Sequence, residues 1–547
     1  MADETTNQGI PEPEGHSDVI ETEYEIGQDN IETQIGPFGL DIHNPVFLIS
    51  GVAIVAFVFY TLALPEQASS VFSSMFSYTT KTFDWFFLGA SDLVVLFALA
   101  LIVLPVGSVR LGGAEATPDY SYIGWFAMLF AAGMGIGLMF YGVSEPMSHF
   151  STAFGGTAVG ENGIRTDWAP LGGAAGDQEA AIRLGMAATI YHWALHPWAI
   201  YAMVALALAL FSFNKGLPLT IRSAFYPLLG ERVWGWWGHL IDTIAVFATL
   251  FGLATSLGFG ATQANAGLNE LFGIPIGTGT EVILITAITA VALISVLRGL
   301  DGGVKILSEI NMGLAGLLAL FVLITGPTVW LLSFFWDSLL AYAENLIPLS
   351  MPFGRDDVNY SQGWTAFYWA WWISWSPFVG MFIARVSRGR TVREFVTCVL
   401  IIPSLVCVFW MSIFGGTAIH QVVTDGYTAA QDADLPLQLF KMLDPLPIAS
   451  LTSFIGIVLV IVFFVTSSDS GSLVIDTITA GGKVDAPVPQ RVFWCIFEGA
   501  VAIALLVGGG LAALQSMVIS TGLVFTIVLL VMCFSIWKGL VSERHSR

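Results

Sequence analysis

Tryptophan is concentrated in two short segments of this chain. One segment places four indoles within seven residues, at Trp369, Trp371, Trp372 and Trp375. The other, HWALHPWAIYA, adds Trp193, Trp198 and Tyr201 around Pro197. Indole faces arranged around a cavity bind quaternary ammonium or sulfonium cations by cation–π attraction, on the order of 2 kcal/mol or more for a desolvated contact. Such a cavity needs no counter-carboxylate, which suits a zwitterion. The alternative is that the rings fill interfaces between helices.

Hydroxyl groups offer a second kind of chemistry. The run FFVTSSDS places Thr466 and Ser467 in the later half of an apolar segment. Hydroxyl and loosened carbonyl oxygens bind hard cations such as sodium without adding charge. The commoner alternative is a hydroxyl that bonds back to its own helix. Thr249, Thr255 and Ser256 lie in another apolar segment; one interpretation is that they face the same cavity, and the other, which we adopt at this point, is that they are structural.

The remaining polar groups in apolar segments are interpreted as structural. Glu145 lies before Pro146 and is expected to end a span, while His192 and His196 are expected to form hydrogen bonds between helices. Asp469 is expected near the cytoplasmic mouth, as a gate or a structural residue, because a carboxylate in a membrane must be paired or wet. Clustered catalytic His, Asp or Glu residues are not evident, which argues against a membrane-embedded enzyme.

Three alternating glycines, Gly133, Gly135 and Gly137, interrupt an otherwise apolar run. Glycine weakens a helix, and unwound backbone survives in a bilayer only where protein or a water-filled cavity satisfies it. Broken helices of this kind coordinate ions in transporters. The other interpretation is close helix packing through Gly133 and Gly137, which are four residues apart.

The elements that must position these residues are membrane-spanning helices. The chain has 55% hydrophobic residues, 11% charged residues and a mean hydropathy of +0.75, and windows of about 20 apolar residues recur along it. Twelve spans are predicted, at residues 46–64, 85–107, 121–148, 187–213, 234–263, 279–297, 308–334, 363–386, 396–418, 449–473, 491–508 and 512–537. With both termini cytoplasmic, 15 of the 20 Lys and Arg residues fall on the cytoplasmic side, as the positive-inside rule requires.

Two further segments flank or divide these spans. Residues 1–40 are rich in acids, have no Lys or Arg before residue 37 and are predicted to form a disordered, solvated cytoplasmic tail, with a regulatory or partner-binding arm as the alternative. Residues 336–351 are too polar to cross and are predicted to form an interfacial helix. Five spans lie on each side of that helix, after two leading spans, and this arrangement permits an inverted repeat. The four cysteines lie in apolar windows and are interpreted as small core residues.

Three segments, GMGIGLMFYGVSEP, HWALHPWAIYA and FYWAWWISWSPFVGMFIARVSRGRTVREF, together closely resemble the betaine/choline/carnitine transporter family. The resemblance extends at lower density from about residue 40 to residue 535. It implies an all-α membrane protein with a LeuT-like fold: leading helices in 41–110, inverted five-helix repeats in 111–335 and 352–537, and a short tail in 538–547. It also implies a homotrimer in the cell membrane, with no cofactor and no nucleic-acid partner.

The resemblance assigns roles to individual positions. An aromatic box would consist of Trp193, Trp198, Tyr201 and Trp372, with Trp371 and Trp375 alongside and with Ile136, Gly137 and Ser256 as further substrate contacts. One sodium ion would be bound by the carbonyls of Ala131, Met134 and Phe463 and by the hydroxyls of Thr466 and Ser467.

Two positions depart from the family pattern. A second cation site in sodium-coupled members uses two threonines one turn apart on the fifth span. Here Thr249 is followed by Leu253, although Phe378 still matches. Choline-carrying, proton-coupled members place an aspartate where Gly137 stands, which argues against choline as cargo.

The function expected from the resemblance is sodium-coupled import of a betaine-type compatible solute, glycine betaine first, by alternating access. Alternatives are a sodium-independent substrate/product exchanger of the carnitine type, and a symporter of ectoine, proline or dimethylsulfoniopropionate. A channel is a further alternative of a different class.

Overall fold

The computed structural model describes residues 10–298 and 304–545, and nearly all of its regular structure is helical. The longer helices are α1 (Val46–Ala63), α2 (Pro65–Val103), α3 (Tyr122–Gly133), α4 (Ile136–Gly155), α5 (Gln178–Trp193), α6 (Leu195–Ala209), α8 (Trp236–Phe272), α9 (Thr278–Arg298), α10 (Val304–Thr325), α11 (Thr328–Ser350), α13 (Ala366–Val386), α14 (Val392–Val423), α17 (Ala449–Thr479) and α18 (Val488–His545). The short ones are α7 (Tyr226–Leu229), α12 (Val358–Tyr360), α15 (Ala429–Asp432), α16 (Gln438–Leu443) and the single turns η1 (Pro105–Ser108), η2 (Leu210–Asn214), η3 (Ile221–Phe225), η4 (Gly230–Trp234), η5 (Ser361–Thr365) and η6 (Leu435–Leu437).

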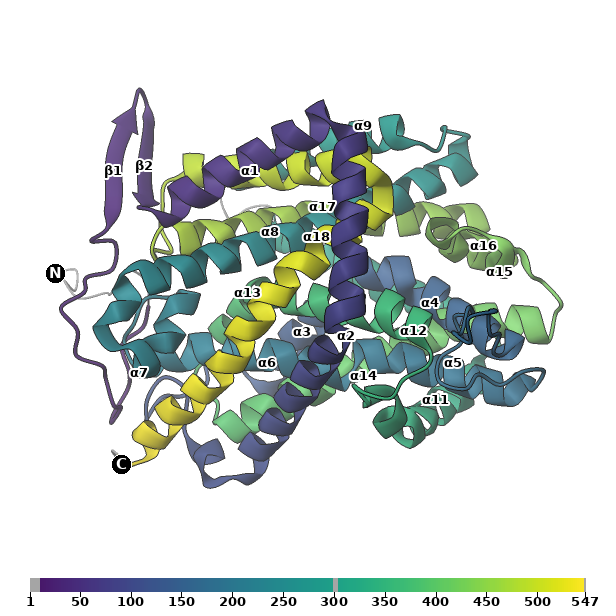
Figure 1. Cartoon of the computed structure of the whole chain (residues 1–547), viewed down its shortest axis with the longest axis horizontal. Coiled ribbons are helices and arrows are strands. Elements are labelled where there is room, and N and C mark those ends of the chain that lie inside the picture. The colour runs from purple at the N-terminus through teal and green to yellow at the C-terminus, as the bar shows by residue number, and fades with distance from the viewer. Residues whose placement is uncertain (1–9, 299–303, 546–547) are drawn as a thin grey trace.

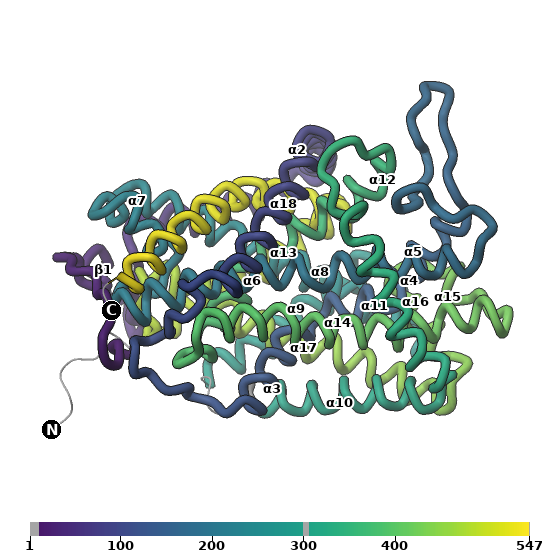
Figure 2. Tube along the Cα trace, turned by 90° about the horizontal axis from the view of Figure 1, so that it is seen from below, coloured from purple at the N-terminus to yellow at the C-terminus, as the bar shows by residue number. Residues whose placement is uncertain are grey.

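The long helices pack side by side into one bundle (Figure 1). Within the described ranges, nine helices are long and apolar enough to cross a membrane, or ten if the bent pair α3 and α4 counts as one span. The prediction of an all-helical, multi-span membrane protein is therefore confirmed at this level. The described chain begins and finishes at the same end of the bundle, here called the termini end, and the long loop 156–177 lies at the opposite, distal end (Figure 2).

The third predicted span is broken within the glycine run. α3 ends at Gly133, α4 begins at Ile136, and the two helices are bent by 64°. Met134 is extended (φ −94°, ψ 138°), and Gly135 is extended as well. Of the two interpretations of the glycines, the structure shows the unwound one.

Several helix boundaries differ from the predicted spans. α2 begins at Pro65 rather than at residue 85, and α18 runs through the predicted eleventh and twelfth spans with a kink at Gly509 and Gly510. The seventh span ends at Thr325, not at 334, and the helix predicted for 336–351 begins already at Thr328. Gly326 and Pro327 cause that break, because proline lacks the N–H that would continue α10.

The acidic N-terminal segment is the largest difference from the sequence prediction. Residues 10–43 are anchored to the bundle at several points instead of forming a disordered tail, and they include the antiparallel hairpin of β1 (Asn30–Ile35), which is largely exposed, and β2 (Phe38–His43). We call this segment the arm. Its carboxylates pair with bundle cations: Glu14 with Arg388, Asp18 with Lys215 at 2.8 Å, and Asp41 with Lys483 at 2.5 Å. The predicted tail residues 1–9 lie outside the described ranges.

These ion pairs explain why an acidic segment is ordered here. Lys215 also pairs with Glu543 near the end of α18, at 2.9 Å, so one buried ammonium group joins the arm to the C-terminal helix. The Lys215 ammonium holds the pKa of the Asp18 carboxyl below its usual value. Tyr24 stacks on Trp234 with ring centroids 4.2 Å apart. The bundle thus supplies the positive charges that the segment itself lacks.

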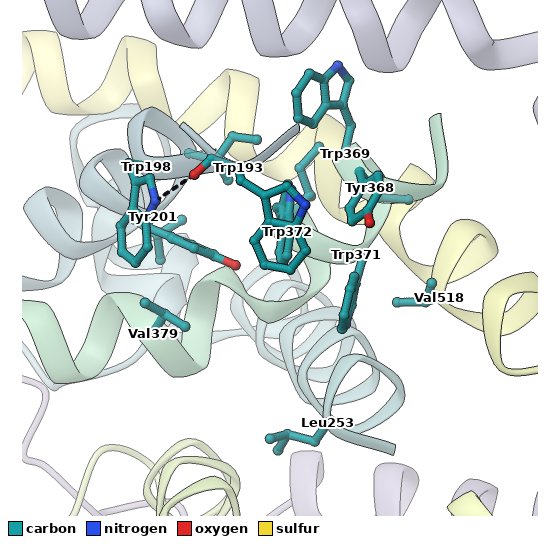
Figure 3. Close-up of a cluster of buried hydrophobic side chains, with 14 of the residues drawn as sticks. Trp193, Trp198, Tyr201, Leu253, Tyr368, Trp369, Trp371, Trp372, Val379 and Val518 are labelled. Carbon is teal, nitrogen blue, oxygen red and sulfur yellow. Dashed lines mark hydrogen bonds between the residues drawn. The ribbon is translucent and has the colours of Figure 1, made fainter. Parts of the chain in front are cut away.

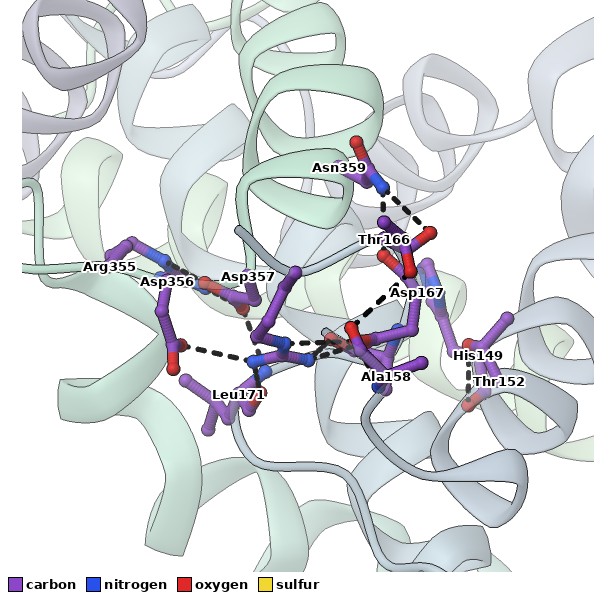
Figure 4. A network of polar contacts seen from close by, with 12 residues as sticks. His149, Thr152, Ala158, Thr166, Asp167, Leu171, Arg355, Asp356, Asp357 and Asn359 are labelled. Carbon is purple, nitrogen blue, oxygen red and sulfur yellow. Dashed lines mark hydrogen bonds and ion pairs between the residues drawn. The ribbon is translucent and has the colours of Figure 1, made fainter. Parts of the chain in front are cut away.

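At the distal end, Arg165 and Leu171 of loop 156–177 join that loop to Asp356 and Asp357, in the segment before α12 (Figure 4). Arg165 binds Asp167 through two nitrogens, at 2.6 and 3.1 Å, and reaches Asp356 at 3.0 Å. Asp357 accepts two bonds from Arg355 and one from the backbone N–H of Leu171 at 2.7 Å. Bidentate pairs of this kind fix geometry as well as charge.

Candidate functional site

A small cavity of about 30 Å³ lies beside the break between α3 and α4. It is lined by Ala132, Gly133, Met134, Gly135, Gly137, Leu138, Trp193, Pro197, Trp198, Tyr201, Trp371, Trp372, Trp375 and Cys407. All six aromatic residues predicted for the site therefore face one cavity. We call it the aromatic cavity.

The rings meet each other edge to face and face to face (Figure 3). Trp193 and Trp372 have centroids 4.9 Å apart at 69°, Trp371 and Trp372 stack at 4.7 Å, and Trp198 meets Tyr201 at 5.1 Å. Figure 3 shows that Trp369, by contrast, points away from the cavity; its indole stacks on His196. The aromatic cavity is nearly closed by its own rings in this conformation.

Local backbone chemistry holds two of the indoles. Pro197 has no N–H, so the carbonyl of Trp193 lacks its helical donor, and the indole N–H of Trp198 donates to that carbonyl at 3.1 Å. The indole of Trp372 donates to the carbonyl of His192 at 2.8 Å. The junction between α5 and α6 thus positions rings from both α6 and α13.

Gly137 must be a glycine for the rings to close in this way. A Cβ atom at this position would lie 2.9 Å from Cη2 of Trp193 and 3.2 Å from Cη2 of Trp371. Both distances are shorter than ordinary carbon contacts. Any side chain here, an aspartate included, would push the two indoles out of their present places.

Three buried donors at the aromatic cavity have no hydrogen-bond partner within the described part of the chain. They are the indole N–H groups of Trp371 and Trp375 and the hydroxyl of Tyr201. Buried polar groups are normally paired. Unpaired donors beside a cavity are available to an acceptor on a ligand, such as a carboxylate.

A larger cavity of about 400 Å³ adjoins the first, and we call it the inner cavity. Its lining includes all five residues predicted for sodium, Ala131, Met134, Phe463, Thr466 and Ser467. It continues along α13 past Phe378 to Arg385, toward the termini end. Ala132, Met134 and Trp375 line both cavities, so the two share a wall.

The hydroxyl of Thr466 bonds the carbonyls of Val462 at 3.0 Å and Phe463 at 3.3 Å within its own helix. This is the commoner behaviour that the sequence also allowed. Thr466 nevertheless lines the inner cavity, and its hydroxyl oxygen retains lone pairs for a cation.

Three predicted residues are not brought to either cavity. Among the described residues that line the cavities, Ile136, Ser256 and Thr249 do not occur. Ile136 packs against Gly260 of α8, and the hydroxyl of Thr249 bonds Ala245 O at 2.7 Å. Phe378 does line the inner cavity, but Thr249 does not meet it there.

The sequence interpretation missed a buried polar group behind the aromatic cavity. Glu145 lies inside α4 rather than at the end of a span, and it is fully buried. His192 does bond across helices, to Glu145 at 2.6 Å and to Thr365 at 2.9 Å. The ligand atoms of Glu145, His149 and His192 lie within 4.8 Å of one another, close enough for a metal ion, but both oxygens of Glu145 already accept hydrogen bonds. No single segment of the sequence signals this cluster.

The architecture is that of a helical multi-span membrane protein with a buried aromatic site for a small solute. Residues 45–545 match the profile of the betaine/carnitine/choline family of transporters. The chain is 67% identical to a glycine betaine/proline/choline transporter of Vibrio parahaemolyticus over 98% of its length and 97% of that protein. It is 55% identical to glycine betaine transporter 1 of the same organism, over 96% and 98% of the two chains.

A glycine betaine transporter of Bacillus subtilis is 43% identical over 92% of this chain and 95% of its own length. Among solved structures, a manganese transporter of Eremococcus coleocola is 12% identical over 77% of this chain and 88% of its own, with a TM-score of 0.36, which is too low to support an argument. The chain belongs to the betaine/carnitine/choline transporter family. That family consists of transporters rather than enzymes.

Proposed function

We propose that this protein imports betaine-type compatible solutes by sodium symport through alternating access, with glycine betaine as the first candidate. The observation that carries the proposal is the wall that the two cavities share. Ala132, Met134 and Trp375 contact both the aromatic cavity and the cavity of the sodium candidates. A cation that draws Met134 of the α3–α4 break toward Thr466 of α17 would also shape the solute site, which is the differential interaction that coupling requires.

The solute chemistry follows from the lining. The quaternary ammonium group would lie among Trp193, Trp198, Tyr201 and Trp372, and its carboxylate would accept from the unpaired donors of Trp371 and Trp375. The Vibrio relative named above is a transporter of glycine betaine, proline and choline. Choline therefore joins the candidates, although Gly137 had argued against it.

The wider architecture is proposed with this function. Twelve spans result if α13 and both halves of α18 are counted as crossings, and the two inverted repeats of a LeuT-like fold would then follow two leading helices. Residues 328–350 would lie at the interface. Both termini would be cytoplasmic, in a homotrimer in the cell membrane, and no cofactor other than the coupling ion would be needed.

Uptake of labelled glycine betaine into proteoliposomes tests the proposal. Inward sodium gradients should drive accumulation, whereas equal potassium gradients should not. Accumulation with potassium alone would contradict sodium symport. Counterflow without any ion gradient would instead favour the carnitine-type exchanger, and competition by ectoine, proline, choline and dimethylsulfoniopropionate would rank the solutes.

A further inference from the structure

The carboxylate of Glu145 is bound to the rings of the aromatic cavity. One oxygen, Oε2, accepts from the indole N–H of Trp193 and from the hydroxyl of Tyr368, both at 2.5 Å. The other oxygen, Oε1, contacts His192 Nδ1 at 2.6 Å and His149 Nε2 at 3.2 Å. Glu145 is thus held by groups from α5 and α13 and by His149 of its own helix, and α5 and α13 also supply four of the six rings of the aromatic cavity.

The hydrogen bonds around this cluster can be completed without a protonated histidine. Thr365 Oγ1 lies 2.9 Å from His192 Nε2 and can donate to it, which leaves Nδ1–H to donate to Glu145. Among the described residues, no Lys or Arg pairs with Glu145. The arginine nearest in the network, Arg355, lies 5.8 Å from the ring centre of Tyr360 and is bound to Asp357. With both imidazoles neutral, the cluster carries the negative charge of the carboxylate.

Trp193 lies between this charge and the unwound segment. Its N–H edge faces Glu145, while Cη2 at its far edge lies beside the position of Gly137, two helical turns earlier on α4. Tyr368, the other donor to Oε2, stacks on Trp372 with centroids 5.5 Å apart. Trp193 lines the aromatic cavity, and Tyr368 stacks on a ring that lines it. Both side chains therefore donate a hydrogen bond to the same carboxylate.

We propose that Glu145 is the counter-charge of the aromatic cavity, acting on the solute through the intervening rings. Its field adds to the attraction of the ring faces for a cation, and its hydrogen bond to Trp193 draws positive charge to the N–H edge. The inference rests on the proposed function and names the group that discriminates among its solutes by charge. At equal shape, the site favours a net cationic solute over an uncharged one, without the aspartate that Gly137 excludes.

The size of the effect follows from the separation of the charges. A cation within about 6 Å of the Trp193 ring centre lies on the order of 8 Å from Glu145. At an effective dielectric constant of about 20, opposite unit charges at that separation change a dissociation constant by roughly tenfold or more. For glycine betaine the effect is smaller, because repulsion of its own carboxylate offsets part of the attraction.

The test compares choline with its uncharged isostere, in which a tert-butyl group replaces the trimethylammonium group. Both compete against labelled glycine betaine uptake, so shape is held constant while charge changes. In the wild type, choline should inhibit at lower concentration than the isostere. In Glu145→Gln, which keeps the shape and one acceptor oxygen, the ratio of the two inhibition constants should fall about tenfold. An unchanged ratio in a variant that still takes up glycine betaine would overturn the inference.

Two variants separate charge from hydrogen bonding. Tyr368→Phe removes one donor to Oε2 but leaves the charge, so its ratio should stay within about twofold of the wild type. If Glu145→Gln does not reach the membrane, Glu145→Asp replaces it. That variant keeps the charge and should retain the preference for choline, and loss of the preference there would also overturn the inference. A wild type that takes up no betaine at all would instead contradict the proposed function.

Discussion

The two sides of the aromatic cavity are built differently. Toward the termini end, α3, α13 and α17 are separated by the inner cavity of about 400 Å³, whose lining reaches Arg385. Toward the distal end, Glu145, His192 and Thr365 bond α4, α5 and the start of α13 to one another. Farther out, Arg165 pairs with Asp356 and so joins loop 156–177 to the segment before α12.

This difference indicates which contacts must change during transport. If access alternates, the distal hydrogen bonds must break for solute to enter from that side, and the inner cavity must shrink. Under the proposed alternating access, the conformation described here would be the one that opens toward the termini end, because the inner cavity lies on that side. Cation binding at Thr466 and Ser467 would stabilise a different arrangement of α3 and α17, since it draws their oxygens together.

The aromatic cavity lies between the two sides, and its loss should have the largest effect. We expect Trp372→Ala to reduce glycine betaine uptake by about a hundredfold or more, because Trp372 contacts Trp193, Tyr201 and Trp371 and supplies a ring face to the cation. Initial uptake rates at saturating sodium measure this. Trp236→Ala, at an exposed position at the start of α8, is the matched control and should retain nearly full activity. Equal losses in both variants would argue against a specific aromatic site.

The inner side can be tested through its ion. We expect Thr466→Ala combined with Ser467→Ala to raise the half-saturating sodium concentration about tenfold or more, since two oxygen ligands are lost. The sodium dependence of uptake at fixed glycine betaine measures the change. Ser470→Ala removes a hydroxyl from the same cavity one turn farther along α17, and its sodium dependence should match the wild type. An unaltered sodium dependence in the double variant would refute the ion assignment.

The aromatic cavity was predictable because each local motif carries its own signal. Indoles in two apolar segments and glycines in a third are visible in sequence, and the family resemblance joins them. The polar cluster of Glu145 was not predictable. Its partners His192 and Tyr368 lie 47 and 223 positions farther along the chain, and only helix packing brings them together. Similarly, Ile136 and Ser256 belong to the right segments, but they are not among the described residues that line the two cavities.

The arm shows a different reason for a wrong prediction. Its composition, rich in acids and without bases, is typical of a solvated segment. Composition does not reveal that Arg388, Lys215 and Lys483 lie on one face of the bundle, where they pair with Glu14, Asp18 and Asp41. The boundary between α10 and α11 was placed wrongly for another reason. The helix-breaking pair Gly326 and Pro327 was visible in the sequence, but the predicted span was continued through it.

On the distal side, acid should loosen loop 156–177. The hydrogen bonds of Arg165 lower the pKa of the Asp167 carboxyl to about 2. Since this is below its unfolded value of about 3.9, the pair stabilises the loop above about pH 4 and loses that effect as pH falls toward 2. Hydrogen exchange at Ala158 and Ala169, whose N–H groups donate to Asp167, should report it after correction for intrinsic rates.

Asp167→Asn provides the comparison for that experiment. The variant should exchange severalfold faster than the wild type at pH 5, and the difference should shrink as the pH approaches 2. A difference that stays constant across this range would mean that the ion pair does not hold the loop. At neutral pH, Asp167→Asn should retain most of its glycine betaine uptake, because the loop lies outside both cavities. Its fold-change in uptake should be smaller than the fold-change in half-saturating sodium concentration in the Thr466 and Ser467 double variant.

The smallest effect should come from Thr249→Ala. Leu253 lies one turn after Thr249 on α8 and packs closely on α17, since a Cβ at Gly471 would lie 2.4 Å from its Cδ1. The leucine side chain offers no oxygen and therefore cannot bind sodium as a second threonine would. The Thr249 hydroxyl is already bonded to Ala245 O, and Thr249 lines neither cavity. The half-saturating sodium concentration should therefore change less than about twofold, with a Hill coefficient near one, in wild type and variant alike. A shift as large as that of the Thr466 and Ser467 double variant would contradict this expectation. It would show that a second sodium site forms in another conformation, with Thr249 moved toward Phe378. Sodium binding would then no longer be confined to the inner cavity.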